Sequence, residues 1–298
     1  MATAVTRART SPKSVQSRRL GSIPWLVFGF STRVGGVSKA YGGRSLNLGF
    51  TPHDQRKNVE RNRELFLKQI GAIDGHKVWP LIALRQIHSD IIHRVSSTYV
   101  GQPSMSGDGL ITNTPGIAIA VQTADCLPVI LVDTKKRAVG VFHAGWRGTL
   151  RRIVQKGVGE MRRHFGTSPG DIEAAIGPGV GGCCYQVGKE VQIKFESQFA
   201  YGSELFREVK ESDPIREKYP LLFLTRRAPG HSELPSNLFL DLTEANRRQL
   251  IDAGVSARRI EIAGLCTVCR NDLLFSHRVE EGVTGRMMAV AGIRPAKR

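Results

Sequence analysis

Two residues that could do chemistry together stand within one stretch of the chain, Thr123 to Thr149. Cys126 opens an apolar run, and a second apolar run ends at His143, with the basic turn Lys135–Arg137 between them. Apolar, β-branched runs around a polar turn predict a pair of strands buried on both faces. If the strands pair antiparallel, the thiol and the imidazole lie at the same end of the sheet. Such a pair is half of a zinc site or a Cys–His catalytic pair.

Further candidates lie earlier in the chain. His88 follows an apolar run over residues 78–84 and is a second candidate ligand, although a lone histidine in a strand region is more often a core or surface residue. Arg33 lies beside a Gly-Gly turn that could hold an anion through N–H groups and a guanidinium, or be a plain β-turn with an exposed arginine. Asp108 is interpreted as the cap of a turn.

The remaining four cysteines could form a separate structural zinc site. Cys266 and Cys269 have the CxxC spacing, but Cys183 and Cys184 are adjacent, which fits the usual paired spacing poorly. Small buried apolar side chains are the default interpretation of these cysteines.

The rest of the chain alternates between strand and helix patterns. Apolar runs predict strands at residues 24–30, 91–95, 117–121, 171–176, 260–263 and 288–293. Amphipathic spacing and caps predict helices at about 54–70, 150–165, 189–199 and 241–254. The segment 202–235 contains four prolines and predicts a mobile insertion.

The first 22 residues are basic and rich in serine, and the first acidic residue of the chain is Asp54. This composition predicts a disordered N-terminal extension over residues 1–22, or alternatively a transit peptide. The length of the chain allows one large domain or two.

Composition excludes several classes of protein. The chain of 298 residues carries a net charge of +17, but the charge is spread and no binding motif accompanies it, so small anionic substrates explain it better than nucleic acid. No window of 18 apolar residues predicts a membrane span. Five cysteines, an odd number, argue against a secreted disulfide framework and predict reduced thiols in the cytoplasm.

Six segments together carry a family resemblance. They are RQIH (85–88), GDGLIT (107–112), TADCLPV (123–129), HAGWRGT (143–149), IGP…CY (176–185) and FS…TGR (275–286). In order over about residues 25–293, they resemble the YfiH or laccase-domain family, also called the multicopper polyphenol oxidase or peptidoglycan editing factor family. The resemblance implies an α/β (α+β) fold and one catalytic domain over residues 23–295. This single globular domain would have a duplicated mixed-sheet core flanked by helices, similar to a deamidating toxin. The likeness of residues 30–34 to 275–279 could be a trace of this duplication or chance.

The resemblance also implies a site and an activity. It implies one zinc ion held by His88, Cys126 and His143, with an open fourth position, which is the form of a catalytic zinc site. Members are described as purine nucleoside phosphorylases acting on adenosine, inosine, guanosine or methylthioadenosine, and some also deaminate adenosine. We therefore expect purine nucleosides and phosphate as small-molecule partners of a monomer or homodimer.

Within that expectation, the polar residues near the motifs receive roles. Asp125 could handle the proton in deamination, and Arg33 and then Arg278 are the first choices for the phosphate cradle. Asn47 and Gln86 are expected to contact substrate.

Three alternatives compete with this interpretation. A copper-dependent laccase needs a histidine-rich array, and eight histidines without any His-x-His pair argue against it. A hydrolase could use Cys126 as nucleophile and His143 as base on amides, including a peptidoglycan precursor. A binding module without catalysis is the third. The chain departs from the family pattern at His277, where an aromatic residue is more common, and in having Cys183 and Cys269.

Overall fold

The computed structural model describes residues 13–210 and 236–296. The chain folds into two compact units. The first unit combines residues 1–181 with 242–298, and the second comprises residues 182–241. The single domain predicted over residues 23–295 thus contains a smaller unit inserted within it.

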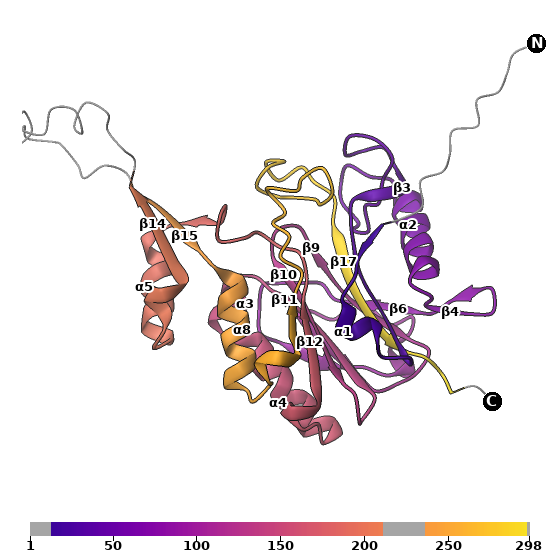
Figure 1. Ribbon diagram of the computed structural model, residues 1–298. Coiled ribbons are helices and arrows are strands. Elements are labelled where there is room, and N and C mark those ends of the chain that lie inside the picture. The colour runs from indigo at the N-terminus through magenta and orange to yellow at the C-terminus, as the bar shows by residue number, and fades with distance from the viewer. Residues whose placement is uncertain (1–12, 211–235, 297–298) are drawn as a thin grey trace, which may run out of the picture. The chain divides into compact units, whose positions relative to one another are not determined.

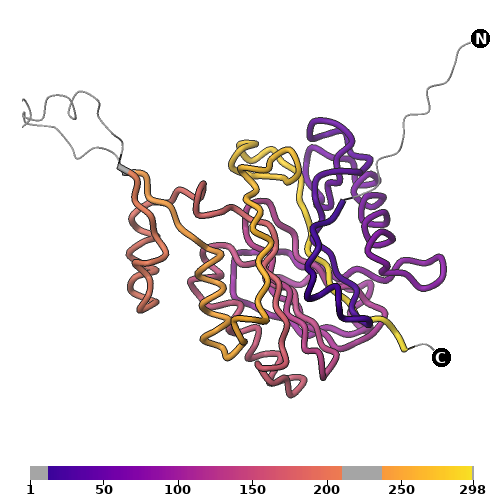
Figure 2. Tube along the Cα trace, viewed as in Figure 1, coloured from indigo at the N-terminus to yellow at the C-terminus, as the bar shows by residue number. Residues whose placement is uncertain are grey.

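The first unit is built on two mixed sheets. The five-stranded sheet has the order β1 (Ser14–Val15), β2 (Leu26–Ser31), β17 (Met287–Ile293), β9 (Ala118–Thr123) and β6 (Leu81–Ala83). The six-stranded sheet has the order β16 (Ile260–Ile262), β12 (Ile172–Ile176), β10 (Leu127–Asp133), β11 (Ala138–Ala144), β8 (Gly109–Thr112) and β7 (Ile92–Arg94). One apolar core takes side chains from both sheets. The last strand, β17, pairs with β2 near the start of the chain, so the yellow and indigo traces run side by side in Figure 2.

Helices cover the outer faces of this pair of sheets (Figure 1). Helix α2 (Arg56–Gln69) packs Phe66 and Leu67 against the outer side of the five-stranded sheet. Helix α4 (Ile153–Phe165) covers β11, where Gly157 lies against the ring of Phe142, and α8 (Leu242–Asp252) packs on α4. The predicted α/β fold with mixed sheets flanked by helices is confirmed.

Several local predictions need adjustment. The helix expected at 150–165 is two helices, α3 (Trp146–Leu150) and α4, because Arg152 has a left-handed φ of 63°. The expected Gly-Gly turn is largely strand β3 (Val34–Ser38). The smaller elements of this unit are β4 (Ile73–Asp74), β5 (Lys77–Val78), η1 (Ser97–Tyr99), η2 (Pro169–Asp171) and η4 (Ala257–Arg259).

The expected disorder of residues 1–22 is wrong for residues 14–21. Strand β1 pairs with β2, and α1 (Arg18–Gly21) follows it. The carboxylate of Glu261 accepts the N–H groups of Arg18 and Arg19, and Leu20 is fully buried in the core. Long-range capping and burial therefore order a segment whose composition alone predicts disorder. Residues 1–12 lie outside the described part of the chain.

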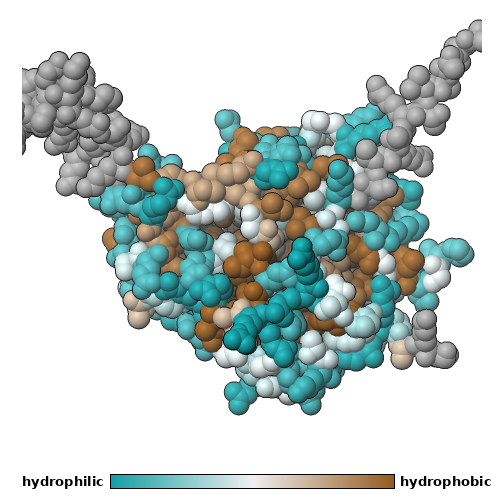
Figure 3. Space-filling model, in the orientation of Figure 1, coloured by the Kyte–Doolittle hydropathy of each residue, from teal (hydrophilic) through white to brown (hydrophobic). Residues whose placement is uncertain are grey.

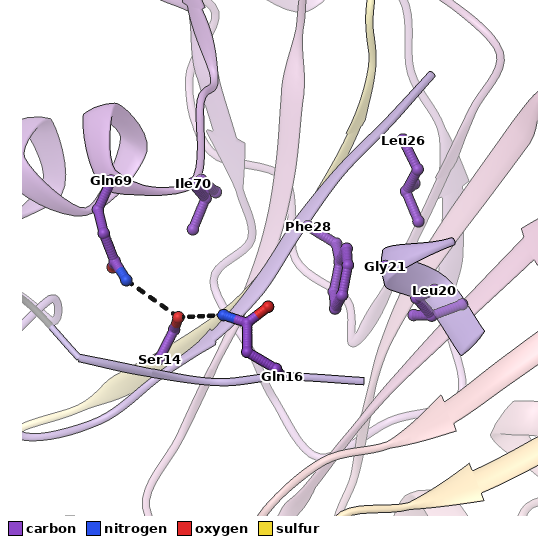
Figure 4. A pocket seen from close by; sticks show the side chains of 8 residues that line it. All are labelled: Ser14, Gln16, Leu20, Gly21, Leu26, Phe28, Gln69 and Ile70. Atoms are coloured by element: carbon purple, nitrogen blue, oxygen red, sulfur yellow. Dashed lines mark hydrogen bonds between the residues drawn. The ribbon is translucent and has the colours of Figure 1, made fainter. Parts of the chain in front are cut away.

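The ordered N-terminal segment closes a small hollow against the end of α2 (Figure 4). Ser14 accepts hydrogen bonds from the amides of Gln16 and Gln69, and Phe28 and Ile70 line the apolar side. These contacts tie β1 to α2.

The described residues of the second unit form a three-stranded antiparallel sheet and the helix α5. The strands are β13 (Gln186–Val187), β15 (Ser236–Leu240) and β14 (Phe206–Lys210), and α5 (Lys189–Gln198) and η3 (Gly202–Leu205) accompany them. Phe195 of α5 contacts the ring of Phe206 edge-on. The insertion predicted over 202–235 thus begins with ordered structure, and its residues 211–235 lie outside the described part.

Among the described residues, no helix is both long enough and apolar enough to span a bilayer. On the face drawn in Figure 3, hydrophobic patches are separated by hydrophilic side chains.

Candidate metal centre

The β10–β11 hairpin brings Cys126 and His143 to the same end of the six-stranded sheet. The two strands pair antiparallel with Pro128 opposite His143, and Cys126 directly precedes β10. Every residue of both strands is buried. The pairing and the double-sided burial predicted from the sequence are confirmed.

His88 reaches the same place from another part of the fold. It follows β6 of the five-stranded sheet, and its Nε2 lies 3.9 Å from Sγ of Cys126. The rings of His88 and His143 meet edge to face with centroids 4.9 Å apart. The candidate ligand atoms of His88, Cys126 and His143 all lie within 4.8 Å of one another. The structure therefore assembles the three residues that the family resemblance implies as ligands.

Asp108 organises both histidines, a role that its interpretation as a turn cap missed. Its fully buried carboxylate lies 2.8 Å from Nδ1 of His143. The same carboxylate accepts the backbone N–H of Ile87, His88 and Ser89 and the Ser89 hydroxyl. This clustering of donors supports the left-handed backbone of His88, whose φ is 55°. In the sequence, the Gly-Asp-Gly segment around Asp108 is the feature from which this role could have been inferred.

The charges at the centre are coupled. Burial alone would raise the pKa of Asp108, but hydrogen bonds from His143 and Ser89 outweigh it and lower the pKa to about 2. Burial would lower the pKa of His143, but the Cys126 thiolate and Asp108 raise it to about 9. Burial would likewise raise the pKa of Cys126, but His143 and His88 lower it to about 6. In the absence of other groups, the site favours a thiolate beside an imidazolium.

The donor set fits a small, tetrahedral metal ion. Asp108 occupies Nδ1 of His143 and leaves Nε2 as the coordinating atom, in the manner of carboxylate–histidine–metal arrangements. Zinc–sulfur and zinc–nitrogen bonds place tetrahedral S and N ligands about 3.6 Å apart. The Cys126–His88 separation of 3.9 Å is close to this value. One thiolate and two imidazoles suit zinc and also copper.

Gly145 lets the backbone pass close to this cluster. A Cβ at this position would lie 2.9 Å from Sγ of Cys126 and 3.2 Å from Cδ2 of His88. The Ala-Gly-Trp segment after His143 therefore needs glycine at this position to leave room for the side chains of Cys126 and His88.

Asp125 lies beside the cluster but has its carboxylate engaged elsewhere. One oxygen accepts the hydroxyls of Thr267 at 2.6 Å and Ser276 at 2.7 Å, and the other accepts the N–H of Arg278 at 2.8 Å. Asp125 is buried and has a φ of 88°. These contacts fix the chain just before Cys126, and a proton-transfer role for Asp125 stays a prediction.

The two expected amide contacts to substrate are engaged in the protein. Gln86 pairs through both its amide atoms with the backbone of Gln122, at 2.8 and 2.7 Å. Asn47 is fully buried, and its oxygen accepts the N–H groups of Gly49 and Arg286. In this arrangement both side chains support loops, and their contact with substrate stays a prediction.

The two expected phosphate-binding arginines differ in their surroundings. The guanidinium of Arg33 lies 3.0 Å from a Glu280 carboxylate oxygen and 4.7 Å from the centre of the Phe275 ring. Arg278 has an exposed side chain, and its backbone N–H binds Asp125 next to the cluster.

The default interpretation of the remaining four cysteines as small buried side chains is wrong, because Cys183 and Cys269 are exposed and Cys184 and Cys266 are half-buried. Cys183 and Cys184 belong to the second unit, and Cys266 and Cys269 belong to the first. The alternative, a four-cysteine zinc site, is a hypothesis from the sequence alone.

Comparison with known proteins gives a consistent relationship. The family described as "Multi-copper polyphenol oxidoreductase laccase" matches residues 27–294. The Bacillus subtilis protein named purine nucleoside phosphorylase YlmD is 31% identical over 279 residues, covering 91% of this chain and 90% of that protein. A Deinococcus radiodurans protein named purine nucleoside phosphorylase is 34% identical, covering 89% of this chain and 88% of its own length. The crystal structure of YlmD from Geobacillus stearothermophilus superimposes with a TM-score of 0.77 at 30% identity, covering 97% of this chain and 98% of that one. The chain therefore belongs to the multicopper polyphenol oxidoreductase laccase family, which is the YfiH or laccase-domain family that its motifs predicted.

Proposed function

We propose that this protein is a purine nucleoside phosphorylase whose catalytic centre is a zinc ion held by His88, Cys126 and His143. The observation that carries the proposal is the cluster of these three ligand atoms within 4.8 Å, with Asp108 behind His143. The names of the relatives, purine nucleoside phosphorylase in Bacillus subtilis and Deinococcus radiodurans, supply the reaction class. Zinc is preferred to copper because a catalytic zinc site uses three protein ligands and an open position.

His88, Cys126 and His143 would hold the zinc ion, which would supply a Lewis acid for an acceptor atom of the substrate. Asp108 holds the Nδ1 proton of His143 and fixes the orientation of the imidazole. The lone pair of Nε2 is then available to the metal ion. The low pKa of Cys126 makes it a thiolate at neutral pH, ready to act as a ligand.

Phosphorolysis requires a phosphate oxygen to bond to C1′ of the ribose while the C1′–N9 bond breaks. The purine leaves with the electron pair and takes up a proton, and ribose 1-phosphate is the second product. Arg33, with Arg278 as the second candidate, would hold the phosphate, and Asn47 and Gln86 would contact the nucleoside after local rearrangement. These roles follow the family motifs, and the contacts that Arg33, Asn47 and Gln86 make within the protein suggest mutation of each of them as a specific test.

Adenosine deamination is the finer part of the proposal. In that reaction a water oxygen bonds to C6 of the purine, the C6–N6 bond breaks and ammonia leaves. Asp125 is the candidate to move the proton, because it is the neighbour of Cys126 in the chain. Its three hydrogen bonds predict that this role would require Ser276 or Thr267 to release it.

The experiment is a product analysis with metal-quantified protein. Adenosine and inosine are incubated with and without phosphate, and the bases, ribose 1-phosphate and inosine are separated by chromatography. His143→Ala should abolish every zinc-dependent product, and His76→Ala, an exposed histidine in the β4–β5 turn, is the matched control. Free base that forms only with phosphate supports phosphorolysis, and inosine formed from adenosine without phosphate supports deamination. Stoichiometric zinc with neither product contradicts the nucleoside proposal.

A second function has its own supporting observation. Cys126, His143 and Asp108 form a thiol–imidazole–carboxylate series in which the pKa of the thiol is lowered to about 6 and that of the imidazole is raised to about 9. This is the arrangement of a cysteine hydrolase. Such an enzyme would cleave amides, including a peptidoglycan precursor, and it would keep its activity in a chelator and lose it in Cys126→Ser. Loss of activity in the chelator excludes this alternative.

A further inference from the structure

The guanidinium of Arg33 is held on several sides by groups of the protein. It donates to the backbone carbonyls of Asn271 at 2.8 Å and Tyr41 at 3.0 Å, and it lies over the ring of Phe275. Among the described residues, the carboxylate that contacts this guanidinium is that of Glu280, with 3.0 Å between the nitrogen and the oxygen. The neutral contacts fix the position of the charge, and Glu280 neutralises it.

Glu280 lies in a set of donors suited to an oxyanion. One carboxylate oxygen contacts Arg33, and the other accepts the backbone N–H of Ser276 at 3.2 Å and the hydroxyl of Thr284. A guanidinium, a backbone N–H and a hydroxyl converging on one group are the donors that commonly bind phosphate in proteins. The Arg33 and Glu280 side chains are 15% and 18% exposed, so their charges are only partly screened by solvent.

This donor set is tied directly to the metal centre. The hydroxyl of Ser276 and the N–H of Arg278 both bind Asp125, the residue before Cys126. An anion in the place of the Glu280 carboxylate would therefore be bound by the same short segment that fixes the chain at Cys126.

The segment that carries Glu280 can withdraw at little cost in burial. His277, Val279, Glu281 and Val283 are exposed, and the turn has left-handed φ values of 48° at Glu281 and 88° at Gly282. Few apolar contacts resist a local opening of such a turn.

We infer that Glu280 occupies the binding position of the phosphate substrate and competes with it for Arg33, Ser276 and Thr284. This inference rests on the proposed phosphorylase function. Glu280 thereby sets the affinity for phosphate: the observed association constant is the intrinsic one multiplied by the fraction of molecules in which Glu280 has withdrawn. The Arg33 carbonyl contacts persist when the anion is exchanged.

The test measures binding of inorganic phosphate by calorimetry, without nucleoside, to the zinc-loaded protein. Glu280→Gln keeps the shape and the acceptor oxygen but removes the charge, and we expect phosphate to bind about tenfold more tightly to it. Glu281→Gln is the matched control, because it changes the net charge equally at the next, exposed residue and should leave the affinity within about twofold of the wild type. Adding Arg33→Gln to Glu280→Gln should remove the gain.

A purely structural ion pair makes the opposite prediction. In that case Glu280→Gln would lower the melting temperature and leave phosphate affinity unchanged or weaker than in Glu281→Gln, and the inference would be overturned. Phosphate affinity raised in Glu280→Gln supports the inference even if no nucleoside is cleaved, and such a result would count against the proposed reaction alone. Full turnover with no change in the KM for phosphate in Glu280→Gln would overturn the inference and leave the phosphorylase function standing.

Discussion

The imidazole of His143 donates from Nδ1 to the carboxylate of Asp108 across 2.8 Å, and both side chains are buried. The two residues are 35 positions apart in the chain: His143 is in β11, and Asp108 directly precedes β8, the strand that pairs with β11. This contact selects the tautomer of His143 in which Nε2 carries a lone pair that is available to a metal ion.

Asp108→Asn should weaken metal binding while the fold persists. An amide cannot hold the Nδ1 proton as the carboxylate does, and loss of such outer partners costs about 10- to 100-fold in metal affinity. Competition with a chromophoric chelator measures the affinity, and circular dichroism checks the fold. Zinc affinity equal to that of the wild type would show that Asp108 does not orient the ligand.

Gly145→Ala should disturb the cluster selectively. The added Cβ would stand 2.9 Å from Sγ of Cys126, which forces the ligand to shift. A displacement approaching 1 Å lowers activity by about 100-fold. Gly159→Ala is the control, because nothing lies within 4 Å of its Cβ position in α4, and alanine favours a helix there by about 0.5–1 kcal/mol. Equal activity in the two variants would contradict the steric argument.

The helix that follows His143 depends on α8 for its position. Gln249 is fully buried and donates to the carbonyl of Thr149 at 2.7 Å. Gln249→Ala should lower the free energy of unfolding by about 2 kcal/mol, since it removes a buried hydrogen bond to that carbonyl and creates a cavity. Urea denaturation measures the change, and Ile251→Ala on the exposed side of α8 should stay within about 0.5 kcal/mol. A similar loss in both variants would indicate a general effect on the helix.

How much of the centre could be predicted depends on the range of the interactions. The strand pair ending at Cys126 and His143 follows from local patterns, because apolar runs and a polar turn fix a hairpin. His88 lies beyond a strand of the other sheet, and only the family motif connects it with the other two residues. Asp108 was missed because its partners come from two distant segments, and a turn aspartate looks the same in sequence.

The roles predicted for substrate-binding residues show where local sequence patterns mislead. Arg33, Asn47 and Gln86 are polar residues in Gly-rich or strand-end segments, which is where ligands are often bound. In the structure, Asn47 and Gln86 form hydrogen bonds with backbone groups, and Arg33 pairs with Glu280. Glu280 is far from Arg33 in the sequence, so this pairing cannot be read from a local pattern. Residues 14–21 were likewise predicted to be disordered, because a cap supplied by Glu261 cannot be read from local composition.

The cap on α1 predicts a specific pH dependence of stability. Burial alone would raise the pKa of Glu261, but its hydrogen bonds from Arg19, Ser17 and Arg18 lower it below the ordinary value of 4.5. The unfolded chain therefore binds this proton more tightly than the folded chain, and the stabilisation is complete above about pH 4.5 and lost as the pH falls through the lower folded value.

Glu261→Gln tests this dependence. The wild type should be more stable than the variant at pH 7, and the difference should shrink as the pH falls below 4.5. Chemical denaturation at several pH values measures both proteins. A difference that stays constant in acid would mean that the carboxylate charge contributes nothing to the cap.

The most direct test of the central claim is the release of ribose 1-phosphate from inosine before and after removal of the metal. The protein is stripped with a chelator, assayed with phosphate, reloaded with one equivalent of zinc and assayed again. A zinc-dependent phosphorylase loses the product on stripping and regains it with zinc, and Cys126→Ser regains neither zinc nor activity. Undiminished cleavage by the metal-free protein, or cleavage that needs no phosphate, would contradict the assignment of the His88–Cys126–His143 cluster as the centre of a phosphorylase.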